Sequence, residues 1–128
     1  MNLDRVWWSL GALLVVLAVI ICLVPVHQVP GAFEWNDKAS HIAGHAAMAA
    51  YFAGLVPRRG WWKVFVFLFA FGLSIEFAQY AMRVGRDGDL RDVLANSAGA
   101  VLGLVLARLG LARWPAWAAW LLGRRATQ

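Results

Sequence analysis

The sequence predicts an all-α membrane protein with four transmembrane helices, on the basis of its composition, four long apolar stretches and the placement of its tryptophans. Of the 128 residues, 62% are hydrophobic and only 15% are charged. Soluble domains carry roughly 25% charged residues, so this chain has too little charge to cover a soluble surface. The length fits one domain, residues 1–128.

Four apolar stretches approach the ~20 residues that a helix needs to cross a bilayer. The stretches are residues 6–24, 39–56, 61–82 and 93–111. The second is the weakest, because His41 and His45 interrupt it and alanine and glycine dominate it. Small residues are nevertheless typical of membrane helices that pack closely, as are Gly99 and Gly103 in the fourth stretch. Residues 113–122 are too short to span, and tryptophans at every third position predict a short interfacial helix there.

The eight tryptophans mark the ends of these stretches. They lie in the first residues of a stretch or just outside one, at positions 7, 8, 35, 61, 62, 114, 117 and 120. The indole ring prefers the headgroup level of a membrane, where its N–H stays in contact with water. A buried soluble core would not place every tryptophan at a stretch end, so the pattern supports the boundaries above.

The basic residues predict the orientation of the helices, since cytoplasmic loops are enriched in Lys and Arg. The second connection and the C-terminal segment carry basic residues with no acid, namely Arg58, Arg59, Lys63, Arg113, Arg124 and Arg125. The first and third connections carry acids as well. We therefore expect both termini and the second connection in the cytoplasm, and the first and third connections outside.

The net charge of +5 and the single cysteine exclude other classes of function. The arginines cluster at the ends of apolar stretches rather than on a basic face, which argues against nucleic-acid binding. Cys22 is the only cysteine, which rules out an intrachain disulfide, and its place inside an apolar stretch argues against a zinc site. Membrane lipids are the expected surroundings, and no cofactor is expected.

Polar residues that topology does not explain gather on the outward side. They lie at the start of the second helix, the end of the third, the third connection and the start of the fourth: Asp37, Lys38, His41, Glu76, Gln79, Arg86, Asp89, Asp92 and Asn96. Spacings of three or four residues place the members within each helix on one face. Ionisable residues inside a span are costly, so they are candidates for a functional site.

These residues also carry a resemblance. The pattern Asp37-Lys38-x-x-His41, Glu76-x-x-Gln79 and Gly85-Arg86-x-x-Asp89-x-x-Asp92-x-x-x-Asn96-x-x-Gly99-Ala100-x-x-Gly103 resembles the VanZ-like family over residues 35–105. The resemblance implies a multi-pass protein of the bacterial cytoplasmic membrane, in a family named for a teicoplanin-resistance protein. His45 is a departure, because the family usually has an aromatic residue there.

Three classes of function follow. The first is binding or shielding of an amphiphilic ligand at the outer face, such as a lipid-linked cell-wall component or a lipoglycopeptide, with Lys38 and Arg86 attracting phosphate. The second is a small membrane enzyme acting on a lipid or lipid-linked headgroup, with His41 as base or with His41, His45 and Glu76 as weak metal candidates; the H-E-x-x-H pattern is absent. The third is a structural membrane subunit whose polar residues hold helices together.

Overall fold

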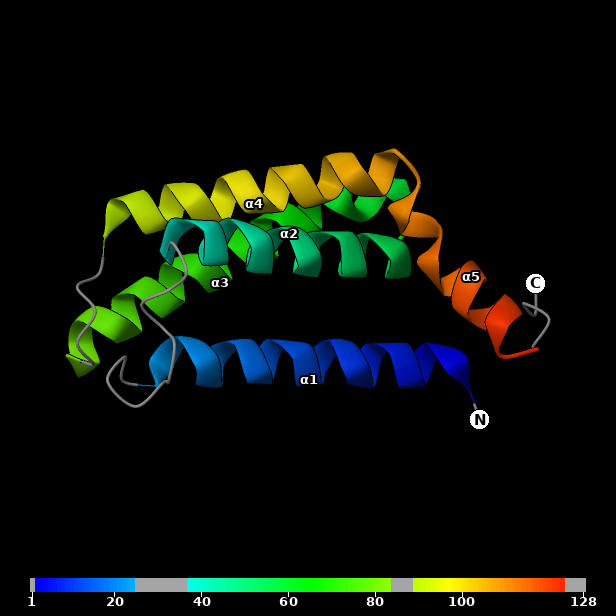
Figure 1. Ribbon diagram of the computed structural model, residues 1–128, viewed down its shortest axis with the longest axis horizontal. Helices are drawn as coiled ribbons and strands as arrows, with labels where there is room; N and C mark the ends of the chain where they lie inside the picture. The colour runs from blue at the N-terminus through cyan, green and yellow to red at the C-terminus, as the bar shows by residue number, and fades with distance from the viewer. Residues whose placement is uncertain (1, 25–36, 84–88, 124–128) are drawn as a thin grey trace.

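The computed structural model describes residues 2–24, 37–83 and 89–123 and is helical throughout (Figure 1). Its elements are α1 (Leu3–Leu23), α2 (Asp37–Leu55), η2 (Arg58–Gly60), α3 (Trp61–Met82), α4 (Leu90–Arg108), η3 (Leu111–Arg113) and α5 (Trp114–Leu121). No strand occurs in these residues, which confirms the all-α prediction. The four long helices overlap the four apolar stretches with ends that agree within three residues, and α5 lies in the short C-terminal segment.

Short polar side chains and backbone geometry define the helix ends. Asn2 caps α1 by accepting a hydrogen bond from the backbone N–H of Asp4, and Asp89 caps α4 by accepting one from that of Arg91. Such caps satisfy N–H groups that have no partner within the helix. At the C-terminal end of α3, Arg83 adopts a left-handed conformation with φ 50°, which ends the helix.

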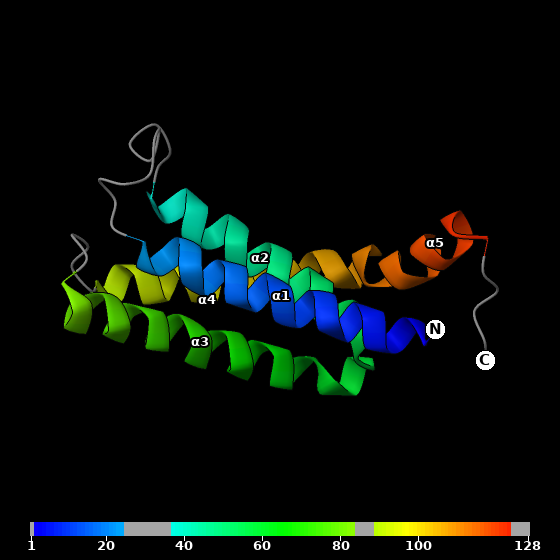
Figure 2. The same cartoon turned by 90° about the horizontal axis from the view of Figure 1, so that it is seen from below.

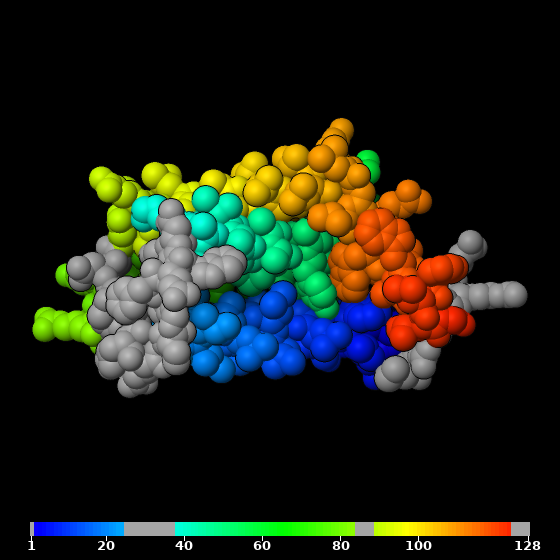
Figure 3. All heavy atoms as spheres, in the orientation of Figure 1, coloured from blue at the N-terminus to red at the C-terminus, as the bar shows by residue number. Residues whose placement is uncertain are grey.

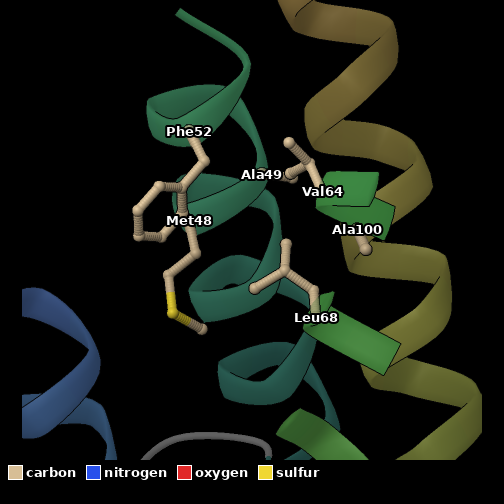
Figure 4. Close-up of a cluster of buried hydrophobic side chains, with 6 residues drawn as sticks. All are labelled: Met48, Ala49, Phe52, Val64, Leu68 and Ala100. Carbon is tan, nitrogen blue, oxygen red and sulfur yellow. The ribbon is translucent and has the colours of Figure 1, made fainter. Parts of the chain in front are cut away.

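The core lies between α2, α3 and α4. Its buried apolar side chains come from all three helices (Figure 4): Met48, Ala49, Phe52, Val64, Leu68 and Ala100. A Cβ atom added to Gly99 would lie 2.4 Å from the carbonyl oxygen of Ile42, and one added to Gly103 would lie 2.3 Å from that of Ala46. The two glycines therefore allow the backbones of α2 and α4 to meet, as their spacing predicted.

Three of the described helices are long and apolar enough to cross a membrane, namely Leu3–Leu23, Arg58–Met82 and Leu90–Arg108. In α1 only Gly11 is buried, while Leu13, Val16, Ile20 and Ile21 are exposed. An apolar helix with so little buried surface fits a lipid environment. The helix α2 does not meet the same standard, because its sequence is rich in alanine and contains two histidines. A span by α2 therefore stays a prediction.

The long helices alternate in direction along the chain (Figures 1 and 2). The start of α1, the end of α2, the start of α3 and the end of α4 lie together at the right of Figure 1, as does α5. The space-filling view shows α1 along the lower edge of the bundle, against α2 (Figure 3). All the acid-free basic segments within the described residues thus lie at one end of the bundle.

Reporter fusions test the predicted orientation. We expect reporters at Gln128 and near Arg59 to read as cytoplasmic, and reporters near Gly31 and Gly88 to read as external, because basic residues without acids stay inside. Paired alkaline phosphatase and fluorescent-protein fusions measure the two sides. A cytoplasmic reading near Gly88 would contradict both the orientation and the outward position of the polar residues.

Candidate functional site

Polar side chains from three helices are buried together where α2 begins, α3 ends and α4 begins. The buried members are His41 and His45 on α2, Glu76 and Gln79 on α3, and Asp92 and Asn96 on α4. We call this set, together with Lys38 and Asp89, the polar cluster. Seven of the nine residues predicted as site members belong to it, namely all except Asp37 and Arg86, and His45 is an eighth member that was not among those nine.

Lys38 joins the first turns of α2 and α4. Its ammonium group donates a hydrogen bond to a carboxylate oxygen of Asp92 and lies 3.7 Å from Oδ2 of Asp89. The side chain of Asp92 is 9% exposed, whereas that of Lys38 is 42% exposed. The positive charge of the more exposed Lys38 therefore compensates the negative charge of the nearly buried Asp92.

Asp89 connects α4 to α3 through its backbone. Its N–H donates to Oε2 of Glu76 at 3.2 Å, while its side chain accepts from the N–H of Arg91 at 2.9 Å. That accepted hydrogen bond, with the nearby charge of Lys38, lowers the pKa of the exposed Asp89 carboxyl group from its ordinary value. Asp89 is thus held as a carboxylate at the edge of the polar cluster.

His41 is oriented by Asn96. Nδ1 of His41 and Oδ1 of Asn96 are 2.8 Å apart, and because an amide oxygen only accepts, Nδ1 is the donor. The other ring nitrogen, Nε2, lies 3.8 Å from Oδ2 of Asp92. The asparagine therefore fixes the ring so that Nε2 faces the carboxylate side of the cluster.

One group of three residues in the described part of the chain has the geometry to hold a metal ion. Ligand atoms of His41, Glu76 and Asp92 all lie within 4.8 Å of one another, and all three residues are buried. Bonds of about 2.0–2.2 Å to one ion place two ligand atoms roughly 3–4 Å apart, so a small contraction would suffice. The hydrogen bond from His41 to Asn96 is of the kind that orients metal-bound histidines.

His45 has a different environment from His41. Of the three weak metal candidates, only His41 and Glu76 are grouped in the structure, and the third member of that group is Asp92 rather than His45. Nδ1 of His45 donates to the carbonyl oxygen of His41 at 3.2 Å, and its ring lies 5.9 Å from that of Phe71. Nε2 of His45 and Nδ2 of Asn96 are buried without a hydrogen-bond partner among the described residues. Both lie within 3.1 Å of the point where a Cβ of Gly72 would be, so Gly72 leaves room for the His45 ring and the Asn96 amide.

Gln79 reaches away from the carboxylates, toward α1. Its side-chain nitrogen donates to the carbonyl oxygen of Cys22 at 2.8 Å. The hydrogen bond attaches the end of α1 to α3 at the level of the polar cluster, so Gln79 positions a helix. The remaining predicted members, Arg86 and the side chain of Asp37, lie outside the residues that the structure describes.

A crosslink tests the contact between α2 and α3. Cysteines at positions 41 and 76 in a Cys22→Ser background are expected to be joined by a short crosslinker that reacts with two thiols, since side-chain ligand atoms of the native His41 and Glu76 lie within 4.8 Å of each other. The shift of the band on a non-reducing gel measures it. Cysteines at 44 and 76 serve as the control, because Gly44 has nothing within 4 Å of its Cβ position. Equal crosslinking of both pairs, or of neither, would contradict the shared site.

The order of these residues along the chain, and their meeting at one end of a helical bundle, can be compared with known families. The sequence model of the VanZ/LLP1 family matches residues 7–112. The chain belongs to the VanZ/LLP1 family. The match extends beyond the residues 35–105 that carry the resemblance in sequence, since it includes most of α1 and reaches η3. No curated protein and no solved structure matches the chain.

In a VanZ/LLP1 protein with this geometry, the residues of the sequence pattern have separable tasks. Lys38, Asp92, His41 and Asn96 form a continuous set of polar contacts between α2 and α4. Gly99 and Gly103 let those two helices approach. Sequence reasoning missed Gly72, because a single glycine in an apolar helix shows nothing of the histidine and asparagine that pack over it.

Proposed function

We propose that this VanZ/LLP1 protein spans the bacterial cytoplasmic membrane four times, with both termini inside, and that its polar cluster binds the headgroup of an amphiphilic or lipid-linked ligand at the outer face. By sequestering or shielding such a ligand, the protein would act in the cell envelope, in a role akin to glycopeptide resistance.

One observation carries the proposal: six polar side chains from three helices are buried at the same end of an otherwise apolar bundle. Polar and ionisable groups at membrane depth are expensive and are retained where they line a site or a pathway. A structural role alone requires fewer groups, because one ion pair such as Lys38 with Asp92 already joins α2 to α4.

The charges indicate the kind of headgroup. Among the described residues of the cluster, the acids Glu76, Asp89 and Asp92 outnumber Lys38, and two of these acids already balance it. The cluster itself therefore suits an amine, or a divalent cation that bridges to phosphate. Direct contacts with a phosphate group would fall to the arginines of the third connection, with Arg86 as the candidate.

The phenotype of point variants tests this function. In a host where expression of the protein raises the teicoplanin concentration needed to stop growth, we expect Arg86→Ala and His41→Ala to abolish the increase at unchanged protein level. The sequence predicts Arg86 in a polar connection between Gly85 and Asp87, and charges in such connections contribute only about 0–1 kcal/mol to stability, so its loss should cost binding rather than folding. Growth inhibition and immunoblots of membranes provide the measurement.

Arg91→Ala is the matched control, because Arg91 is an exposed arginine in the first turn of α4. It removes the same charge from the same side of the protein and is expected to keep the phenotype. Full activity of Arg86→Ala, or loss of activity only where the protein disappears, would favour a purely structural role for the cluster.

A second candidate function is a small membrane enzyme that acts on a lipid-linked headgroup. It is favoured by the grouping of His41, Glu76 and Asp92, which combines an oriented imidazole with two buried carboxylates. A divalent metal held there would polarise a phosphoryl oxygen of the substrate. Stoichiometric zinc or manganese in the purified protein, lost in Asp92→Asn, would favour this candidate over simple binding.

A further inference from the structure

A second site lies at the opposite end of the bundle from the polar cluster. A hollow with a volume of about 460 Å³ opens there between the ends of α2 and α4, with η2 and η3 along its rim. Its lining includes the three arginines Arg58, Arg108 and Arg113, and Trp61. The acid-free basic segments lie at this end too, and their positive charge predicts that it faces the cytoplasm.

Two indole hydrogen bonds hold the segments around this hollow against the end of α2. The Nε1–H of Trp61 donates to the carbonyl oxygen of Ala53 at 3.1 Å, and that of Trp114 donates to the carbonyl oxygen of Tyr51 at 3.0 Å. A Cβ at Gly54 would lie 2.2 Å from Nε1 of Trp114, so the glycine is needed for this close approach. The hollow is therefore framed by fixed contacts rather than by loose side chains.

After α4, a turn that requires glycine brings the chain back to the end of α2. Gly110 has φ 134°, a conformation that other residues rarely adopt. The turn brings η3, and with it Arg113, beside the end of α2. Arg58 is held from the other side, where its guanidinium carbon lies 5.8 Å from the centre of the Trp61 ring.

Membrane topology alone does not explain why three arginines line one hollow. Arg58, Arg108 and Arg113 come from three segments, and none of the residues that line the hollow is acidic. The positive-inside rule requires basic residues at this end of the bundle, but it does not require them to share one hollow. Arg59 and Lys63 illustrate this, because they line a different, more apolar hollow. Arg108 also complements the negative end of α4, which accounts for one of the three charges only.

We propose that this hollow binds the phosphate of an anionic phospholipid headgroup. Arginine is suited to the task because its planar guanidinium contacts phosphate oxygens at two points, and basic hollows between membrane helices on the cytoplasmic side bind anionic headgroups. Trp61 lies at the rim, at the level where tryptophan meets the headgroup region. The site is separate from the polar cluster and does not rest on its proposed function.

Native mass spectrometry of the full-length protein in detergent tests this site, with phosphatidylglycerol as the anionic probe and phosphatidylcholine as the zwitterionic one. We expect the intact protein to retain one phosphatidylglycerol molecule in preference to phosphatidylcholine. Arg58→Gln and Arg113→Gln should each weaken retention about fivefold, the effect typical of one basic residue at a membrane surface. Arg59→Gln, which removes the neighbouring charge, should leave retention unchanged.

Equal retention of the two lipids, or an equal loss in Arg59→Gln and Arg58→Gln, would overturn the proposal in favour of general surface charge. Displacement of the lipid by millimolar inorganic phosphate would also overturn it, since a free anion would then be the better ligand. The thermal midpoint in detergent shows whether each variant is folded, and Arg58 and Arg113 provide two independent variants should one of them fail.

Discussion

Replacing Gly99 by leucine is expected to prevent the protein from accumulating in its folded form. Even a Cβ at this position would lie 2.4 Å from the carbonyl oxygen and 2.9 Å from the Cα of Ile42. Both are backbone atoms, so the clash is relieved only if α2 and α4 separate. Overpacking against movable side chains costs about 1–3 kcal/mol, and a clash against backbone should exceed that range. Separation of the two helices would also pull His41 away from Asn96.

Protein level in membranes and the thermal midpoint in detergent measure the effect. Gly44→Leu is the matched control, because Gly44 also lies on one of these two helices but has nothing within 4 Å of its Cβ position. It is expected to be folded and close to wild type in both measurements. A Gly99→Leu protein with an unchanged midpoint would show that α2 and α4 do not pack as described.

Replacing Asp92 by alanine is expected to destabilise the protein by about 3 kcal/mol, the lower end of the range for breaking a buried ion pair. The loss is large because the carboxylate accepts a hydrogen bond from Lys38 and faces His41 across 3.8 Å. It stays at the lower end because the side chain of Lys38 is 42% exposed and can reach water. Unfolding in mixed detergent micelles measures the free energy.

Two further variants separate the ion pair from other effects of the substitution. Asp89→Asn should cost much less, since Asp89 is 3.7 Å from Lys38 and its side chain is 43% exposed. Combining Asp92→Leu with Lys38→Met should recover much of the loss, because neither charge is then left without its partner. A double variant no more stable than Asp92→Ala would mean that Asp92 acts through His41 instead.

The fold was predictable to the extent that it follows from local pattern. The predicted stretches 61–82 and 39–56 correspond to Trp61–Met82 and Asp37–Leu55, because aromatic belts, proline and the run of apolar residues mark helix ends within the chain itself. The fourth helix begins at Leu90 rather than at residue 93. The difference arises because Asp89 caps the helix, so that Asp92 lies inside its first turn.

The gathering of these polar residues at one end of the bundle was predictable, but the contacts among them were not. Helical spacing placed His41 and His45 on one face as a possible ligand pair. In the structure only His41 turns toward the carboxylates, because Asn96 holds its Nδ1, whereas His45 hydrogen-bonds to the backbone of its own helix. Such a choice depends on which side chains of α3 and α4 stand opposite, and no spacing within α2 contains that information.

By itself, the sequence determined the class of protein, the helices and the end of the bundle at which the polar residues gather. These properties follow from hydrophobicity, helical period and charge bias, all of which act along the chain. Only the tertiary structure decided that Lys38 pairs with Asp92, that Gln79 attaches α3 to α1, and that three arginines share one hollow. Each of these pairings joins residues more than 50 positions apart or from separate segments. They are set by how closely the helices approach, which the glycines at their crossings permit.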